Sequence, residues 1–253
     1  MIDTHAHLPA SIHGDDAADV LERARAAGVT RVIDVATTIA GARDALALAE
    51  RHDGVYACLG IHPHEAGSPG DLDELRRLLA HERAVAVGET GLDYYWDRTA
   101  PAAQQEHFRR HIDLAKRVGK TLMIHDRDAH ADVLRILGDE GAPDRVVFHA
   151  FSGDAAMARE CTEAGYVLSF PGVITFKNAP ALREAAAAAA LDAVLVETDA
   201  PFLTPHPFRG RPNAPSLLPF TLRGLAAAMN VDEDELCAAI RATGQRLFGI
   251  SFT

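Results

Sequence analysis

Short apolar runs rich in valine and isoleucine alternate with amphipathic stretches along most of the chain. Short apolar runs bounded by turn residues are typical of buried strands, and apolar positions repeating every three to four residues are typical of helices. The runs predict strands at Met1–His5, Arg31–Ala36, Val55–Gly60, Ala84–Glu89, Thr121–His125, Arg145–His149, Tyr166–Phe170 and Ala193–Asp199. Buried strands that alternate with helical segments favour a parallel sheet.

The amphipathic stretches predict a helix after most of these strands. The predicted helices are Asp16–Ala27, Ala42–Arg51, Leu72–His81, Ala102–Val118, Ala129–Glu140, Ala155–Ala164, Pro180–Leu191, Leu218–Met229 and Glu233–Arg241. Repeated strand–helix units over 253 residues match the size of a TIM barrel. We therefore expect an α/β fold, a TIM barrel of eight parallel strands with surrounding helices. No linker interrupts the alternation, so residues 1–253 are expected to form a single domain.

The composition limits the class of protein. The formal net charge of −11 argues against coating nucleic acid with the whole surface, because such binding depends on Lys and Arg. An anionic substrate would then need a local source of positive charge, which a metal centre can supply. The three scattered cysteines favour a reducing compartment over a disulfide framework. With no basic and apolar leader and no long apolar window, we expect a cytoplasmic protein that does not contact a membrane.

Six of the thirteen histidines lie where predicted strands end. They are His5, His7, His62, His64, His125 and His149. Three carboxylates, Glu89, Glu197 and Asp199, occupy the ends of two further strands. Because catalytic groups of a TIM barrel come from the carboxyl ends of its strands, these side chains are expected to meet at one rim. The other seven histidines, His13, His52, His81, His107, His111, His130 and His206, are expected to be solvated side chains of helices or loops.

This combination of imidazoles and carboxylates points to metal chemistry. His5 and His7 are two residues apart, so in a strand both point to the same side and can bind one ion. The full set exceeds the needs of one tetrahedral ion and suits two divalent cations that share a carboxylate, for which Glu89 is the natural candidate. The mixed ligands leave Zn, Mn and Mg open. Such a pair activates water, so hydrolysis is the expected reaction. Asp199 is a ligand or a base for the water, and Glu197 supports a ligand or lines the barrel.

A series of motifs carries a resemblance that extends along the whole chain. In order, these include "DTHAHL", "GIHPHEA", "GETGLDYYWD", "FHAFSGD" and "LVETDAPFLTP". The chain resembles the TatD family of metal-dependent deoxyribonucleases, within the amidohydrolase superfamily. That resemblance implies one cation held by His5, His7, Glu89 and Asp199, and another held by Glu89, His125 and His149. It also implies cleavage of DNA ends or single-stranded DNA, typically from the 3′ end, with Asp199 and Glu89 as catalytic residues.

Several other residues are candidate substrate contacts. His62 and His64 resemble the substrate-side histidines of the family, although a role in ordering the loop competes with this interpretation. Arg209 and Arg211, together with Lys177, fall in predicted mouth loops, where they would pair with phosphates or remain solvated surface charges. The aromatic run Tyr94, Tyr95 and Trp96 would stack a base or pack the loop.

Two rival functions stay open at this stage. The first is hydrolysis of an amide, a lactone or another ester, because the superfamily scaffold carries those reactions too. Glu89 stands where many such enzymes have a modified lysine that bridges their metals, which favours the nuclease. The second rival is a metal-binding or scaffold protein without activity, and the presence of all six expected ligands argues against it. No sequence feature indicates an obligate protein partner.

Overall fold

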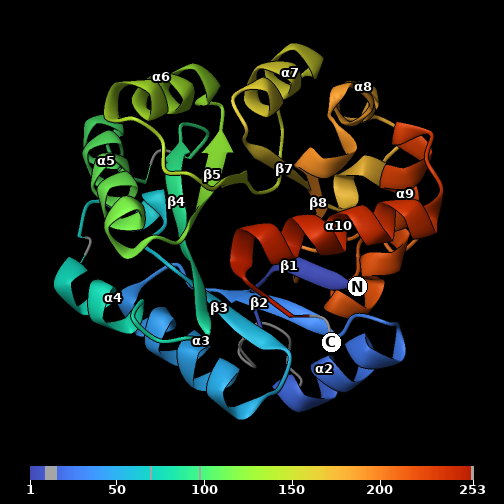
Figure 1. Cartoon of the computed structure of the whole chain (residues 1–253), viewed down its shortest axis with the longest axis horizontal. Coiled ribbons are helices and arrows are strands. Elements are labelled where there is room, and N and C mark those ends of the chain that lie inside the picture. The colour runs from blue at the N-terminus through green and yellow to red at the C-terminus, as the bar shows by residue number, and fades with distance from the viewer. Residues whose placement is uncertain (9–15, 69, 97, 252–253) are drawn as a thin grey trace. The chain divides into compact units, whose positions relative to one another are not determined.

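The computed structural model describes residues 1–8, 16–68, 70–96 and 98–251 (Figure 1). Within these ranges, eight strands form one sheet in the order of the chain, from β1 to β8. Each strand pair whose register is defined is parallel, and helices separate successive strands. The predicted fold class, an α/β TIM barrel with eight parallel strands, is confirmed.

The chain divides into two compact units, one of residues 1–34 and 150–253 and the other of residues 35–149. The first contains β1 (Ile2–Ala6), nearly all of β2 (Arg31–Val35), β7 (Val167–Phe170) and β8 (Val194–Val196). Its helices are α2 (Ala17–Ala26), α7 (Ala155–Glu163), α8 (Pro180–Ala188), α9 (Leu218–Met229) and α10 (Glu233–Phe248), with short 3-10 turns η2 (Gly172–Thr175), η3 (Leu191–Ala193) and η4 (Pro215–Leu217).

The second unit contains β3 (Val55–Leu59), β4 (Ala84–Asp93), β5 (Thr121–Arg127) and β6 (Val146–Phe148). Its helices are α3 (Ile39–Arg51), α4 (Leu72–Leu78), α5 (Pro101–Val118) and α6 (His130–Glu140), and the 3-10 turn η1 (Pro63–Glu65) follows β3. Figure 1 shows α5 and α6 beside β4 and β5. That residues 1–253 act as one domain stays a prediction.

Local sequence signals account for many of the helix ends. The Asp154 side chain accepts hydrogen bonds from the backbone N–H groups of Ala156 and Met157, which caps α7. Asp232 caps α10 in the same way. Such caps satisfy N–H groups that have no partner within the helix. The last turn of α5 ends at Gly119, whose φ of 63° lies in the left-handed region that glycine adopts without strain.

The strand β4 differs most from its predicted extent. The sequence predicts that it ends at Glu89, but it continues to Asp93 and remains paired with β5, with Gly91 opposite His125 and Asp93 opposite Arg127. All its residues are buried. Gly91 has a φ of 138°, and a Cβ there would lie 2.1 Å from the carbonyl oxygen of His125. Glycine at this position is therefore what allows the strand to continue rather than a sign that it ends.

None of the helices in the described part of the chain combines the length and the apolar character that crossing a membrane requires.

Candidate metal centre

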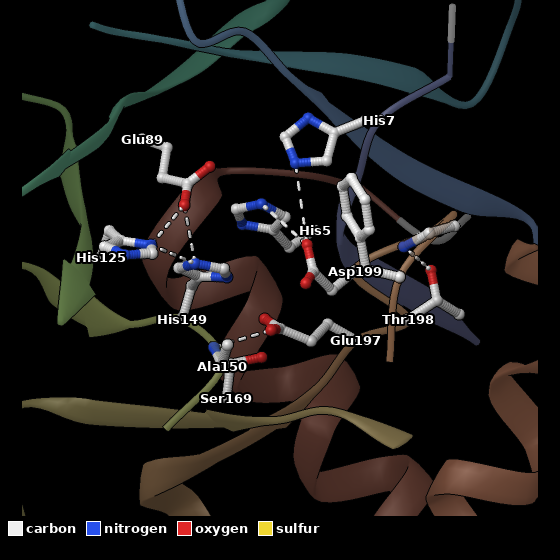
Figure 2. A network of polar contacts seen from close by, with 12 residues as sticks. His5, His7, Glu89, His125, His149, Ala150, Ser169, Glu197, Thr198 and Asp199 are labelled. Carbon is white, nitrogen blue, oxygen red and sulfur yellow. Dashed lines mark hydrogen bonds and ion pairs between the residues drawn. The ribbon is translucent and has the colours of Figure 1, made fainter. Parts of the chain in front are cut away.

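A buried carboxylate, Glu89, is the middle of a cluster of imidazoles in the unit of residues 35–149. Its Oε1 atom lies 2.8 Å from His125 Nδ1 and 2.8 Å from His149 Nε2. Figure 2 shows both rings turned toward this one oxygen. The Nε2 atom of His62 lies 3.6 Å from the same oxygen. Neighbouring parallel strands explain the convergence, because Glu89 lies on β4, His125 on β5, and the other two histidines follow β3 and β6.

The protonation of this cluster follows from burial and charge. Burial alone would raise the pKa of Glu89, but the imidazoles of His149 and His62 and its hydrogen bonds hold that pKa well below the usual range. Burial lowers the pKa of His62 to about 3, so its ring is neutral near pH 7. Burial also lowers the pKa of His125, but Asp93 and Glu89 outweigh it and raise that pKa overall. An ionised carboxylate and a neutral imidazole are the forms that bind a cation, which competes with protons for the ring nitrogens.

Asp93 belongs to this cluster, although it was not predicted as a site residue. Its Oδ2 atom lies 3.0 Å from His125 Nε2 and 3.1 Å from His64 Nε2. Its Oδ1 atom accepts the backbone N–H groups of Tyr95 and Trp96, each at 3.0 Å. One signal was available: side chains two and four residues apart on a strand point to the same side, so Asp93 shares a side with Glu89. The glycines of "GETGLD" resemble the start of a turn, so the strand was predicted to end before Asp93.

A second group lies in the unit of residues 1–34 and 150–253. The Oδ1 atom of Asp199 lies 3.7 Å from His5 Nε2 and 3.7 Å from His7 Nε2 (Figure 2). Backbone hydrogen bonds hold the two segments together, because Asp199 donates to the carbonyl of His5 at 2.9 Å and His7 donates to that of Ala200 at 2.8 Å. The three side chains therefore converge, as their positions at the ends of the first and eighth predicted strands led us to expect.

Buried polar residues fix the backbone beneath this second group. Asp3 accepts hydrogen bonds from Thr198, through the backbone N–H at 2.9 Å and the hydroxyl at 2.5 Å. Burial raises the pKa of Asp3 to about 7, against the effect of these hydrogen bonds. Glu197 accepts the backbone N–H of Ala150 at 2.7 Å (Figure 2). The amide of Asn213 donates to the carbonyl of Thr198 at 2.7 Å. These contacts orient the residues on either side of Asp199.

The donor atoms of these clusters match the preferences of divalent cations. The groups His5, His7 and Asp199; His62, Glu89 and His125; and His62, His64 and Asp93 each offer ligand atoms within 4.8 Å of one another. Imidazole and carboxylate ligands suit Zn and Mn, and carboxylates suit Mg. Three ring nitrogens converge on the buried Glu89, and buried charges are paired in this way or coordinate metals.

Comparison with known proteins identifies the family. The family model described as "TatD related DNase" matches residues 2–249. The chain belongs to the TatD related DNase family. A relative from Mycobacterium tuberculosis, named as the uncharacterized metal-dependent hydrolase TatD, is 48% identical over 261 residues, which cover 100% of this chain and 99% of the relative.

Two further TatD relatives add to this finding. A Cronobacter sakazakii protein named as the 3'-5' ssDNA/RNA exonuclease TatD is 33% identical over 257 residues, covering 98% of this chain and 97% of the relative. The crystal structure of the TatD homolog YJJV from Escherichia coli is similar with a TM-score of 0.94 and 32% identity, covering 99% of this chain and 98% of that one. The resemblance inferred from the motifs is thereby confirmed.

The remaining predicted site residues of this TatD-family chain differ in their surroundings. His62 joins the Glu89 cluster, and His64 pairs with Asp93. Lys177, Arg209 and Arg211 are exposed, and the guanidinium of Arg209 lies 4.0 Å from the centre of the Phe176 ring. Their role as substrate contacts stays a prediction.

The interpretation of the helical histidines was wrong for two of them. His107 and His111 on α5 are only 4% and 0% exposed. They lie on the buried stripe of the helix, which also carries Phe108 and Ile112. His13, assigned to the same solvated class, lies outside the described residues.

Proposed function

We propose that this protein is a metal-dependent nuclease that hydrolyses phosphodiester bonds of single-stranded DNA from the 3′ end. The observation that carries the proposal is the buried Glu89 with His125, His149 and His62 around one of its oxygens, in a chain of the TatD family. The name of the Cronobacter relative supports the 3′-end specificity.

Two divalent cations, of Zn, Mn or Mg, are part of this proposal. We assign one cation to His5, His7 and Asp199 and the other to Glu89, His125 and His149. Bound there, such cations would lower the pKa of a water molecule and draw electron density from a phosphate group.

The chain's own residues would accept the proton of the water and hold the site's side chains in position. Asp199 is the proposed base, and its carboxylate Oδ1 would accept the proton of the attacking water. The hydrogen bond from its backbone N–H to the carbonyl of His5 fixes the position of that carboxylate. The Nδ1 atom of His62 accepts a hydrogen bond from the backbone N–H of His64 at 3.1 Å, and its Nε2 atom faces Glu89. Both nitrogens face protein groups, which supports a place for His62 beside the ligands.

The test is cleavage of an oligodeoxynucleotide labelled at its 5′ end, with Mn, Mg or Zn added and with a chelator control. We expect a ladder that shortens from the 3′ end, only when a cation is present. Replacing a catalytic base lowers a rate by roughly 10² to 10⁴ fold, so Asp199→Asn should lose activity to this degree. Glu163→Gln, an exposed carboxylate at the end of α7, is the matched control and should retain activity.

Three outcomes would count against the proposal. Cleavage that persists in chelator, or full activity of Asp199→Asn, would exclude the proposed mechanism. Absence of DNA cleavage together with rapid, metal-dependent hydrolysis of carboxylic esters or lactones would instead assign the same centre to the rival reaction class.

A further inference from the structure

Two large aromatic side chains, Tyr95 and Trp96, lie on the surface directly after β4. Their exposed fractions are 55% and 45%, and only Phe202 joins them as an exposed large apolar side chain among the described residues. The two rings meet edge to face, with their centres 5.0 Å apart. Contiguous exposed apolar surface rimmed by polar residues is typical of sites that bind a ligand or a partner.

Arginine side chains flank these rings. The guanidinium of Arg127 lies 4.0 Å from the centre of the Tyr95 ring, and that of Arg98 lies 5.6 Å from the centre of the Trp96 ring. Across the ranges that the structure describes, neither guanidinium has a carboxylate partner. Within those ranges no carboxylate neutralises either arginine, although the chain as a whole carries a charge of −11.

The preceding aromatic residue, Tyr94, has a different role. Its hydroxyl lies 2.8 Å from a carboxylate oxygen of Asp132, to which it donates, and accepts a hydrogen bond from Gln105 at 2.7 Å. Its backbone N–H donates to the carbonyl of Arg127 at 2.9 Å. Tyr94 thus packs the loop, which leaves Tyr95 and Trp96 as the residues that face outward.

A direct connection joins the exposed rings to the Glu89 cluster. One oxygen of Asp93 accepts the backbone N–H groups of Tyr95 and Trp96, while the other lies 3.0 Å from His125. Arg127 comes from the same strand as His125, two residues later. A molecule lying on the rings would therefore be adjacent to the proposed cation ligands.

We propose that Tyr95, Trp96, Arg98 and Arg127, together called the aromatic platform, bind single-stranded nucleic acid. The rings stack against a base, and the guanidinium groups pair with the neighbouring phosphates. Base–aromatic stacking tolerates any sequence, because every base has a flat face, and arginine adds affinity for the backbone. This inference rests on the proposed nuclease function and names the residues that would hold its single-stranded substrate.

Intrinsic fluorescence provides a direct test, because Trp96 is the single tryptophan of the chain. The full-length protein with Asp199→Asn, loaded with Mn, would be titrated with an oligothymidylate, with an abasic oligomer of equal length, and with thymidine monophosphate. We expect the oligothymidylate to quench the Trp96 emission at a concentration at least about tenfold lower than the abasic oligomer requires.

Binding would be followed in parallel by the anisotropy of a labelled oligomer. Saturated binding without any change in Trp96 emission would overturn the proposal, and so would equal quenching by the abasic oligomer. The readout needs no cleavage. Failure of the nuclease proposal would therefore leave this test valid.

Kinetics of platform variants provide a second test, with bis(p-nitrophenyl) phosphate as the small diester. Tyr95→Ala and Arg127→Gln should raise KM for the oligonucleotide by about tenfold to a hundredfold. The ratio of kcat/KM for oligonucleotide to that for small diester should fall about tenfold or more, and Tyr95→Phe should restore most of it. Arg83→Gln is the matched control, because Arg83 also lies over a tyrosine ring, 5.5 Å from the centre of Tyr56, but directly before the first residue of β4. It should leave the ratio unchanged.

The outcomes separate the two proposals. Equal losses on both substrates, or an equal effect of Arg83→Gln and Arg127→Gln, would show that the platform residues have a structural role only. A wild-type protein that cuts neither substrate would contradict the nuclease proposal, and the fluorescence titration would still decide the binding proposal.

Discussion

At the scale of single residues, Asp93 connects the imidazole cluster to the loop that follows β4. Its carboxylate faces the ring nitrogens of His125 and His64 with one oxygen and holds two backbone N–H groups with the other. A carboxylate that accepts a hydrogen bond from a ligating histidine orients the ring and increases its basicity. Asp93 is therefore a positioning residue, which acts on the cation through His125.

Asp93→Asn should weaken divalent-cation binding. The amide keeps a similar shape but would present an NH₂ group or a weaker acceptor to His125. Loss of such a partner lowers metal affinity by roughly 10 to 100 fold, which calorimetric titration with Mn or Zn would measure. Asp132→Asn is a suitable control, because Asp132 binds Tyr94 and Arg135 and is not part of the cluster. Unchanged affinity in Asp93→Asn would show that His125 is held by other contacts.

At the scale of elements, α5 contains a buried pair of titratable side chains. The rings of His107 and His111 lie 4.5 Å apart, and Nδ1 of His111 lies 3.0 Å from the carbonyl oxygen of His107. Burial lowers the pKa of His107 to about 4, with Arg110 adding to the effect, and burial lowers that of His111 to about 3. Both rings are thus neutral in the folded protein over a range where an unfolded chain would protonate them.

This pair predicts a loss of stability in acid. Above the unfolded pKa of about 6.5 their contribution is complete, and it falls as the pH drops from there toward the folded pKa values of about 4 for His107 and about 3 for His111, because the unfolded state binds protons that the folded state does not. Each histidine adds a slope approaching about 1.4 kcal/mol per pH unit. Urea unfolding at several pH values should show a shallower dependence in a His107→Gln, His111→Gln double variant than in the wild type. His52→Gln, on a residue with partial exposure, should keep the wild-type dependence, and equal slopes in all three would contradict the assignment.

Most element positions could be predicted from the sequence, and the exceptions have local causes. The predicted starts of α7 and α10 were correct because an aspartate caps each helix. The strand β8 ends at Val196 rather than at the predicted Asp199, because Thr198 donates its N–H to the side chain of Asp3 instead of to a neighbouring strand. Side-chain partners from distant parts of the chain cannot be inferred from an apolar run.

Residues of the candidate site could be predicted only where they lie at the carboxyl ends of predicted strands. His5 and His7 lie near Asp199, and His125 and His149 lie near Glu89, as the strand order leads one to expect. That these side chains bind cations stays a prediction. The buried histidines of α5 were not predicted, because a polar residue on a helix was assumed to face solvent. The same stripe also buries Gln104, whose amide donates to the carbonyl of Asp93 at 3.0 Å.

At the scale of the whole molecule, the charge of −11 limits how nucleic acid is bound. An acidic surface repels phosphates, so only a short segment near the arginines of the platform should make ionic contacts. With two phosphate contacts, the slope of log affinity against log salt should be roughly −1 to −2 for a single strand. Anisotropy titrations over a range of sodium chloride concentrations would measure it. A much steeper slope would indicate a long basic groove and contradict binding at a strand terminus.

The spacing of residues along β5 sets the distance between a proposed cation ligand and a proposed substrate contact. His125 and Arg127 are two residues apart on this strand, which at the rise of an extended backbone is about 7 Å. With the platform as proposed, one strand sets the interval between a histidine beside the proposed cation and an arginine that pairs with a phosphate of the substrate. The number of nucleotides removed at each turnover would then be constant along the polymer, whatever bases it contains. The spacing of two residues on a strand would determine that number, and base recognition would not.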